Sequence, residues 1–204
     1  MPKIVDHDKR RSEIVEAYLT VVARDGLPAA TSRAVAAELH VGTGALWHYF
    51  DGFDAVAAGA YQRISDLTTE RIVAATASLR GLDAFLAMLR EILPLEKRTV
   101  DEAYVVVGFW GRLAANKRIG ETQTDVVEEW RAMLRRHLEE AIEDRTMVPD
   151  TPVDEVINVV LTIAVAQQVH AVTDSELAEP SHQLKMVEFC LLPWRCVPGA
   201  GIEG

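Results

Sequence analysis

The sequence predicts an all-α protein of about nine helices, and three observations support that fold class. Apolar residues recur at offsets of three and four along most of the chain, the spacing of one face of an α-helix, and strand-like alternation is almost absent. Turn residues interrupt this pattern, because Gly81, Pro94, Pro152, Pro180 and Pro193 all fall at expected helix ends. The composition is globular, with 49% hydrophobic and 25% charged residues.

The first three expected helices are short and share one core. They run over residues 9–24, 32–39 and 43–49, and Thr31 or Ser32 is the expected N-cap of the second. Two helices of about eight residues, joined by three residues and packed on a longer helix, predict a helix-turn-helix whose third helix enters a major groove. The residues expected in the shared core are Tyr18, Val21, Val22, Val35, Ala36, Leu39, Val41, Leu46 and Phe50.

The charge is distributed unevenly along the chain, and this decides whether DNA binding is compatible with an acidic protein. The net charge is −10, but residues 1–50 hold six bases and six acids, so that segment is neutral and the excess lies in residues 51–204. A polyanion repels an acidic surface but not a neutral module whose bases cluster at its leading end. The asymmetry therefore permits DNA binding without proving it.

The remaining helices form a second, larger domain. We expect a helix-turn-helix domain over residues 1–52 and a helical ligand-binding and dimerisation domain over residues 53–204. No signal-peptide core and no run of about 18 uninterrupted apolar residues appear, so we expect a soluble cytoplasmic protein without membrane contact. The expected helices of the second domain run over residues 53–79, 82–93, 99–115, 121–144, 153–172 and 182–192.

Catalytic and metal-binding patterns are missing from the sequence. The pair Glu139 and Glu140 and the scattered histidines include no nucleophile–base arrangement, no phosphate-binding glycine loop and no His-Glu-x-x-His pair. Cys190 and Cys196 match no common metal or redox spacing, so we interpret them as reduced thiols, with a disulfide or paired metal ligation as the alternatives. We expect no enzyme activity, no catalytic residues, no metal and no cofactor.

Residues 30–50, ATSRAVAAELHVGTGALWHYF, resemble the signature of the tetracycline-repressor family of bacterial regulators. The run Gly44, Ala45, Leu46, Trp47, His48, Tyr49, Phe50 is similar to that family's recognition-helix motif, and the detailed match covers residues 10–56. Beyond residue 56 only the succession of helices agrees. The resemblance implies a ligand-responsive transcriptional regulator, most simply a repressor, that binds palindromic double-stranded operator DNA as a homodimer and releases it when a small-molecule effector binds.

The resemblance and the side-chain chemistry together indicate the DNA contacts. A hydroxyl and backbone N–H groups at a helix start hold phosphate, and a guanidinium reads guanine. The alternatives are an N-cap and a solvated arginine at residues 32 and 33, a tolerated helix glycine at residue 44, and simple exposure at residues 48 and 49. The expected DNA-contacting residues are Ser32, Arg33, Thr43, Gly44, Ala45, Trp47, His48 and Tyr49, with Lys9, Arg10 and Arg11 from the N-terminal arm.

Four positions depart from the family pattern. Trp47 stands where tyrosine is usual, but its indole N–H keeps one donor. His40 replaces a turn glycine, so we expect strain there, and Gly42 replaces a capping serine. Phe53 stands where a phosphate-binding lysine is common, so one contact is missing, and the basic arm is expected to compensate. These departures leave a second interpretation open, a ligand-binding or scaffold homologue that has lost specific DNA binding.

The second domain is expected to hold the effector site and the dimer interface. For each effector-site candidate the alternative is core packing, and for the interface it is packing within one subunit. The candidate effector residues are Phe85, Met88, Phe109, Trp110, Trp130, Met133, His137, Gln167, Gln168 and His170. The candidate interface residues are Val156, Val160, Ile163, Ala164, Ala171, Leu184, Val187, Leu191 and Leu192.

Overall fold

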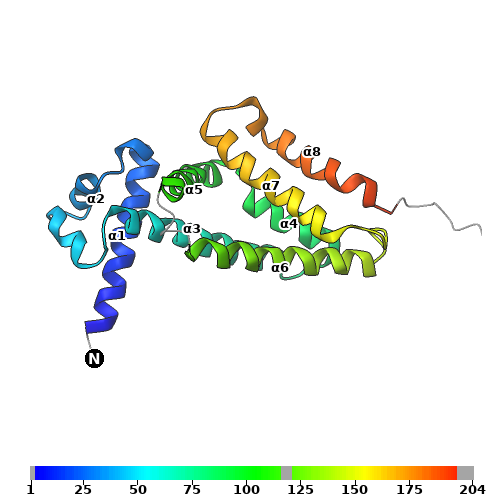
Figure 1. Ribbon diagram of the computed structural model, residues 1–204, viewed down its shortest axis with the longest axis horizontal. Helices are drawn as coiled ribbons and strands as arrows, with labels where there is room; N and C mark the ends of the chain where they lie inside the picture. The colour runs from blue at the N-terminus through cyan, green and yellow to red at the C-terminus, as the bar shows by residue number, and fades with distance from the viewer. Residues whose placement is uncertain (1–2, 116–120, 197–204) are drawn as a thin grey trace, which may run out of the picture. The chain divides into compact units, whose positions relative to one another are not determined.

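A computed structural model describes residues 3–115 and 121–196 of the chain and confirms the all-α prediction (Figure 1). Over these residues the secondary structure is helical, and β pairing is limited to one isolated antiparallel bridge between Met147 and Arg195. The α-helices are α1 (Lys3–Asp25), α2 (Ser32–Glu38), α3 (Phe53–Thr76), α4 (Gly81–Ile92), α5 (Lys97–Ala115), α6 (Glu121–Glu143), α7 (Val153–Val172) and α8 (Pro180–Leu191). The 3-10 helices are η1 (Leu27–Ala29), η2 (Thr43–His48), η4 (Glu176–Ala178) and η5 (Leu192–Trp194).

Several helix ends differ from the predicted ones. α1 begins at Lys3 instead of residue 9, and α8 begins at Pro180 instead of residue 182. Proline suits the first turn of a helix because the N–H that it lacks would have no intrahelical partner there. α3 ends at Thr76, three residues before the predicted end. The third predicted helix, residues 43–49, is the 3-10 helix η2 rather than an α-helix.

The chain divides into two compact units, each built from two segments. The first unit comprises Met1–Leu67 with Lys97–Val126, and the second comprises Thr68–Glu96 with Val127–Gly204. The first unit therefore contains α5 and the first part of α3 in addition to the short N-terminal helices. The predicted domain boundary at residue 52 separates a DNA-binding domain from an effector-binding and dimerisation domain. This boundary stays a prediction.

The first unit has the shared core predicted from the sequence. Tyr18 and Val21 of α1, Val35 of α2, and Leu46 and Phe50 around η2 are all buried. Val22 and Ala36 join them, while Leu39 and Val41 are partly buried against the same cluster. Burial of these side chains holds η2 against α1, although η2 itself is only one short 3-10 segment.

Helix α5 packs tightly on the loop between α1 and α2, and Gly108 permits this. A Cβ added at Gly108 would lie 2.5 Å from Leu27 Cδ2, closer than non-bonded carbons approach. One turn further along α5, Arg112 Nη1 lies 2.6 Å from Asp54 Oδ1. The first unit thus holds α5 by an apolar contact with Leu27 and by an ion pair with the start of α3.

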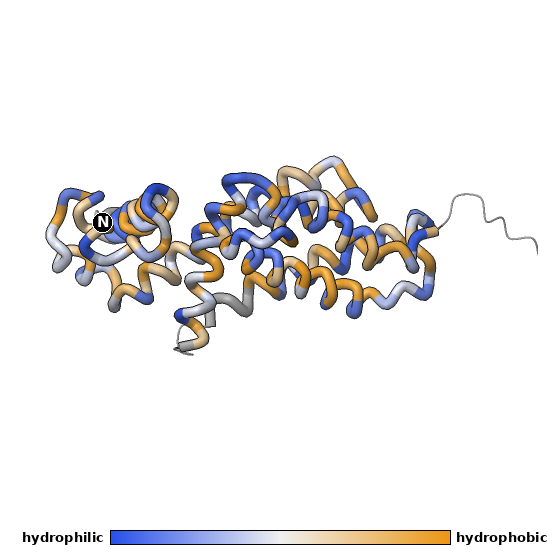
Figure 2. Tube along the Cα trace, turned by 90° about the horizontal axis from the view of Figure 1, so that it is seen from above, coloured by the Kyte–Doolittle hydropathy of each residue, from blue (hydrophilic) through white to orange (hydrophobic). Residues whose placement is uncertain are grey.

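The second unit is built around α4, α6, α7 and α8, which lie together in Figure 1. Its core includes Phe85 and Met88 of α4, Leu134 and Leu138 of α6, and Ile157 of α7. Figure 2 shows hydrophobic and hydrophilic residues interleaved along the helices of both units, as helices with one buried face require. Cys190 and Cys196 were interpreted as reduced thiols, with a disulfide or paired metal ligation as the alternatives, and both are free cysteines in the structure.

Helix α7 (Val153–Val172) is long and apolar enough to cross a membrane by length and composition alone. Its inward face is packed in the core of the second unit, where Val156, Ile157 and Val160 are at most 2% exposed. Its outward face carries Val159, Val165 and Val169, each more than 40% exposed. Two apolar faces on one helix are also what an interface helix of a soluble protein shows.

Candidate nucleic-acid interface

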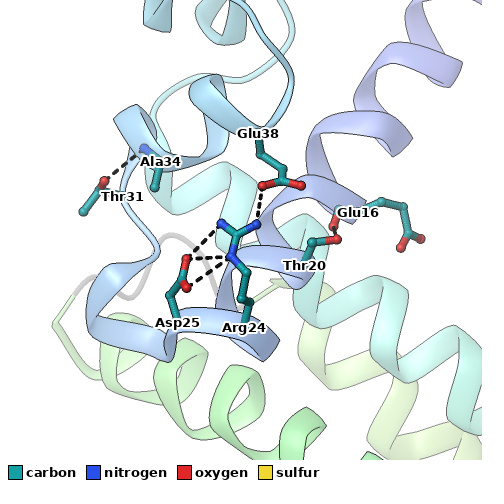
Figure 3. Close-up of polar contacts among 7 residues, drawn as sticks. All are labelled: Glu16, Thr20, Arg24, Asp25, Thr31, Ala34 and Glu38. Carbon is teal, nitrogen blue, oxygen red and sulfur yellow. Dashed lines mark hydrogen bonds and ion pairs between the residues drawn. The ribbon is translucent and has the colours of Figure 1, made fainter.

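The start of α2 is fixed by a side-chain cap. Thr31 Oγ1 accepts a hydrogen bond of 3.2 Å from the backbone N–H of Ala34, so Thr31, not Ser32, is the N-cap (Figure 3). Ser32 is therefore the first residue of α2 and half-buried, and Arg33 is exposed. No hydrogen bond or ion pair involves the Arg33 side chain among residues 3–115 and 121–196, so its guanidinium is available to an external partner.

The turn after α2 has the geometry that a glycine would favour. His40 has φ 56°, in the left-handed region, as its place in the turn led us to expect. The N–H of Val41 donates to the carbonyl of Ala36 over 2.9 Å, which satisfies one of the last carbonyl groups of α2. The backbone of the turn thus stays compact at some conformational cost to His40.

The 3-10 helix η2 presents one face to the core and another to solvent. Leu46 is fully buried, whereas Trp47 is 42% exposed, and Gly44 and His48 are exposed as well. A Cβ at Gly44 would meet nothing within 4 Å among the described residues, so the fold itself does not require glycine there. A glycine with free space around it fits close approach of a bound partner to the backbone. Thr43, Ala45 and Tyr49 are half-buried along the same element.

The three basic residues predicted for the N-terminal arm have different surroundings. Lys9 is exposed and forms no ion pair with the described part of the chain. Arg10 Nη1 lies 2.6 Å from Glu13 Oε2, so its charge is partly compensated. Arg11 donates a hydrogen bond to the backbone carbonyl of Tyr49, and its guanidinium carbon lies 4.2 Å from the centroid of the Phe50 ring. Of these three residues, Lys9 alone has no polar side-chain contact with the described residues.

An ion-pair cluster that the sequence analysis did not identify joins the ends of α1 and α2. Arg24 Nη1 lies 2.8 Å from Glu38 Oε2, and Arg24 Nη2 lies 2.9 Å from Asp25 Oδ2 (Figure 3). The hydrogen bond from Arg24 lowers the pKa of the Asp25 carboxyl, and the bonds from Asp25 and Glu38 raise the pKa of Arg24. Since all three residues are solvent-accessible, they orient the two helices more than they stabilise them.

Phe53, which replaces the expected lysine, is packed within the first unit. Its ring centroid lies 5.7 Å from that of Tyr18, and the Arg112 guanidinium carbon lies 5.3 Å from the Phe53 ring. Burial raises the pKa of the Tyr18 phenol, and the nearby charge of Arg112 acts in the opposite direction. The aromatic side chain at position 53 therefore contributes packing where a lysine would contribute charge.

Comparison of the sequence with known proteins identifies the family of the chain. Residues 81–174 match the profile described as the C-terminal part of BetI-type transcriptional repressors. The chain is 31% identical over 142 residues to the HTH-type transcriptional regulator PksA of Bacillus subtilis strain 168, and the match covers 69% of each protein. The chain belongs to the TetR family of transcriptional regulators.

Solved structures share the fold of this TetR-family protein. A TetR transcription regulator from Haloarcula marismortui has a TM-score of 0.79 at 17% identity, covering 93% of this chain and 100% of that chain. A transcriptional regulator from Rhodococcus has a TM-score of 0.77 at 21% identity, covering 92% and 99%. A regulator from Saccharomonospora viridis, solved in complex with choline, has a TM-score of 0.78 at 17% identity, covering 89% and 95%. The family consists of regulators and not of enzymes.

Five effector candidates of the TetR-family chain lie together in the second unit. Phe85, Met88 and His137 are at most 3% exposed, and Trp130 and Met133 are partly buried against the core cluster that contains the first two. His137 Nε2 has no hydrogen-bond partner among the described residues, and neither does the indole nitrogen of Trp110. Phe109 and Trp110 belong to the first unit, where the Phe109 ring stacks on Tyr61 at 4.4 Å.

Two of the three polar residues predicted on α7, Gln167 and Gln168, have partners within the protein. Gln168 Nε2 donates to the carbonyl of Ile92 over 2.9 Å, and Gln167 Nε2 lies 3.4 Å from Met186 Sδ. These amides therefore tie α7 to the end of α4 and to α8, although Gln167 Oε1 has no partner among the described residues. His170 is half-buried near the end of α7.

Gln183 was missed by the sequence analysis although it is fully buried. Its Nε2 atom donates to the carbonyl of Pro94 over 3.0 Å and to that of Ala178 over 2.7 Å. Gln183, Val187 and Leu191 recur at offsets of four, so the spacing alone would have placed this amide on the inward stripe of α8.

Most predicted interface residues are buried within one protomer. The reason is that α7 and α8 turn these side chains toward α4 and α6, which was the alternative left open for them. Buried residues in this set are Val156, Val160, Ala164, Val187 and Leu191, and half-buried ones are Ile163, Ala171 and Leu184. The exposed apolar residues of the same two helices include Val159, Met186 and Phe189, and Leu192, 58% exposed, follows α8 in η5.

Proposed function

We propose that this TetR-family protein is a cytoplasmic repressor that binds a palindromic operator as a homodimer and releases it when a small-molecule effector binds. The observation that carries the proposal is the exposed face of η2 and α2. Trp47 and His48 are exposed on η2, Arg33 is exposed on α2, and Leu46 beneath them is fully buried. An exposed surface with outward donors and a neutral surrounding charge is suited to major-groove contacts.

The exposed face of α7 and α8 supports the homodimer. A groove of about 700 Å³ lies on this face and is lined mainly by apolar side chains, including Val159, Ile163, Met186 and Phe189. Phe189 is 76% exposed, which is unusual for a phenylalanine in a monomer. A second copy of the chain packed on the same face would bury these side chains and form a four-helix contact. Two reading elements of such a dimer would need to lie about 34 to 36 Å apart to reach successive DNA turns.

The effector site is proposed around His137. His137 is 3% exposed, its Nδ1 atom lies 3.4 Å from Glu140 Oε2, and its Nε2 atom lacks a partner among the described residues. A small ligand with a hydrogen-bonding group would satisfy that atom while its remaining surface packs on Phe85, Met88, Trp130 and Met133. The choline complex of the Saccharomonospora regulator supports a small-molecule effector.

Operator binding is tested by selecting fragments of genomic DNA with the purified protein and titrating the selected fragment in a gel-shift assay. We expect the double variant Arg33→Ala, Tyr49→Ala to lose sequence-specific binding, because both side chains lie on the proposed DNA-facing surface. The matched control is Arg90→Ala, which removes an exposed arginine from α4 in the second unit. Sedimentation would show that each variant keeps the oligomeric state of the parent.

Two results would contradict the proposal. Unchanged affinity of the double variant would show that the assigned surface does not read DNA. Failure of the parent protein to select any fragment with salt-dependent binding would favour the alternative function, a ligand-binding homologue that has lost its operator. Phe53 is the observation behind that alternative, since it supplies no charge where the family commonly has a lysine.

A further inference from the structure

Tyr49 is the C-cap residue directly after η2, and two residues of α1 contact it. The imidazole ring of His7 lies 4.9 Å from the Tyr49 ring, with an angle of 48° between the planes. The guanidinium of Arg11 donates a hydrogen bond to the Tyr49 backbone carbonyl. His7 and Arg11 are one helical turn apart, so a single face of α1 reaches both the side chain and the backbone of Tyr49.

The Arg11 guanidinium makes two contacts at this end of η2. Besides the Tyr49 carbonyl, its guanidinium carbon lies 4.2 Å from the centroid of the buried Phe50 ring. A planar guanidinium can stack on an aromatic face and direct its N–H groups to a carbonyl at the same time, which a lysine ammonium cannot do. Lys9, two residues earlier, has neither kind of contact with the described residues.

The 3-10 helix η2 depends on stabilising contacts from residues outside the helix at its C-terminal end. It is a six-residue 3-10 helix whose N-cap, Gly42, makes no side-chain capping bond. Helices this short are marginal by themselves, and their last carbonyl groups need donors from elsewhere. Arg11 supplies a charged donor to the carbonyl of the C-cap residue Tyr49, where a cation also compensates the partial negative charge of the carbonyl.

We propose that Arg11 and His7 are positioning residues that hold Tyr49 in its DNA-facing orientation, and that Arg11 makes no phosphate contact of its own. This inference rests on the proposed function, because it assumes that Tyr49 reads DNA. It changes the role expected from the sequence, in which Arg11 belonged with Lys9 among the phosphate-binding residues of the arm. Both groups act by narrowing the orientations available to the Tyr49 ring.

The salt dependence of operator binding separates the two roles of a basic residue. Loss of a phosphate contact reduces the slope of log affinity against log salt by about 0.9, whereas loss of a positioning contact lowers affinity without changing the slope. For Arg11→Ala we expect binding to the selected genomic fragment to weaken about tenfold at an unchanged slope. Arg11→Lys should weaken it similarly, because charge alone does not restore the stacked geometry. Lys9→Ala is the matched control, for which the slope should fall.

His7 is tested by keeping or removing its ring. His7→Phe retains an aromatic ring against Tyr49 but no imidazole N–H, and we expect it to bind like the parent protein. His7→Ala removes the ring contact and should weaken binding by about threefold, the size of one aromatic pair at an accessible site. Since His7 is exposed, neither variant is expected to change the fold, which keeps the test valid if Arg11→Ala lowers stability.

Coupling to Tyr49 completes the test. In a Tyr49→Ala background, the His7 and Arg11 variants should cause no further loss, because the positioned side chain is already gone. Additive losses, a reduced salt slope for Arg11→Ala, or full rescue by Arg11→Lys would overturn the inference. If Tyr49→Ala itself binds like the parent, the proposed reading surface fails. If only the His7 and Arg11 variants bind like the parent, the positioning role fails and the proposed function stands.

Discussion

At the scale of single residues, the burial of His137 makes the stability of the protein depend on pH. Its ring is 3% exposed, Nδ1 lies 3.4 Å from Glu140 Oε2, and Arg136 is a charged neighbour. Burial lowers the pKa of His137 below its ordinary value, whereas the hydrogen bond to Glu140 acts in the opposite direction. The Glu140 carboxylate itself is held ionised by the backbone N–H of Gly81, 3.0 Å away, which lowers the pKa of Glu140. Burial therefore favours the neutral form of the imidazole, and the hydrogen bond from Gly81 favours the ionised form of the neighbouring carboxylate.

We expect the protein to lose stability as the pH falls below the ordinary pKa of histidine, about 6.5. The unfolded chain takes up a proton in this range while the folded chain resists it, so the free energy of unfolding decreases until the folded-state pKa is passed. Urea unfolding at pH 7.5 and pH 5.5 measures the change. The variant His137→Gln should depend less on pH over the same interval, and an identical pH dependence would show that other groups cause it.

At the scale of an element, the seven-residue helix α2 depends on its cap. Thr31 Oγ1 accepts from the N–H of Ala34, which would otherwise lack a partner within the helix. Thr31→Ala should lower the free energy of unfolding by about 1 kcal/mol, and Thr31→Ser should restore most of it. Chemical denaturation monitored by circular dichroism checks both variants. Equal stability of Thr31→Ala and the parent would contradict a capping role.

Helical periodicity predicted the elements well, because one buried face imposes its spacing on the sequence. It could not predict that η2 is a 3-10 helix, since six residues are too few to distinguish the two helical periods. The contact between Gly108 and Leu27 joins residues 81 positions apart and depends on packing that no local pattern reports. Local signals therefore decide which segments are helical, and tertiary contacts decide how the short ones are completed.

The sequence predicted only part of the candidate site. The family motif placed Arg33, Trp47 and His48 on an exposed surface, as the structure has them. The role of Arg11 could not be inferred from its charge, because an arginine serves equally to bind phosphate and to hold a carbonyl. On α7, Val156 is buried and Val159 is exposed although both are valines, so hydrophobicity alone could not separate core from interface.

At the scale of the whole molecule, the proposed repressor requires two copies, and the exposed face of α7 and α8 predicts where they meet. Phe189 is 76% exposed and lines the apolar groove on that face. A substitution there is present in both copies of a symmetric dimer, so its unfavourable free energy enters the dimer interface twice. By contrast Val73 of α3, 56% exposed, does not line this groove.

Phe189→Glu should therefore dissociate the dimer without unfolding the protomer. It would place a carboxylate in each half of a mainly apolar contact whose lining includes one lysine, Lys185, and we expect the dimer dissociation constant to rise by at least roughly a hundredfold. Binding to a palindromic operator should weaken with it, because a protomer contacts only one half-site. Val73→Glu is the matched control and should remain dimeric. Analytical ultracentrifugation over a range of concentrations measures both, and a Phe189→Glu dimer as stable as the parent would mean that the two copies associate through another surface.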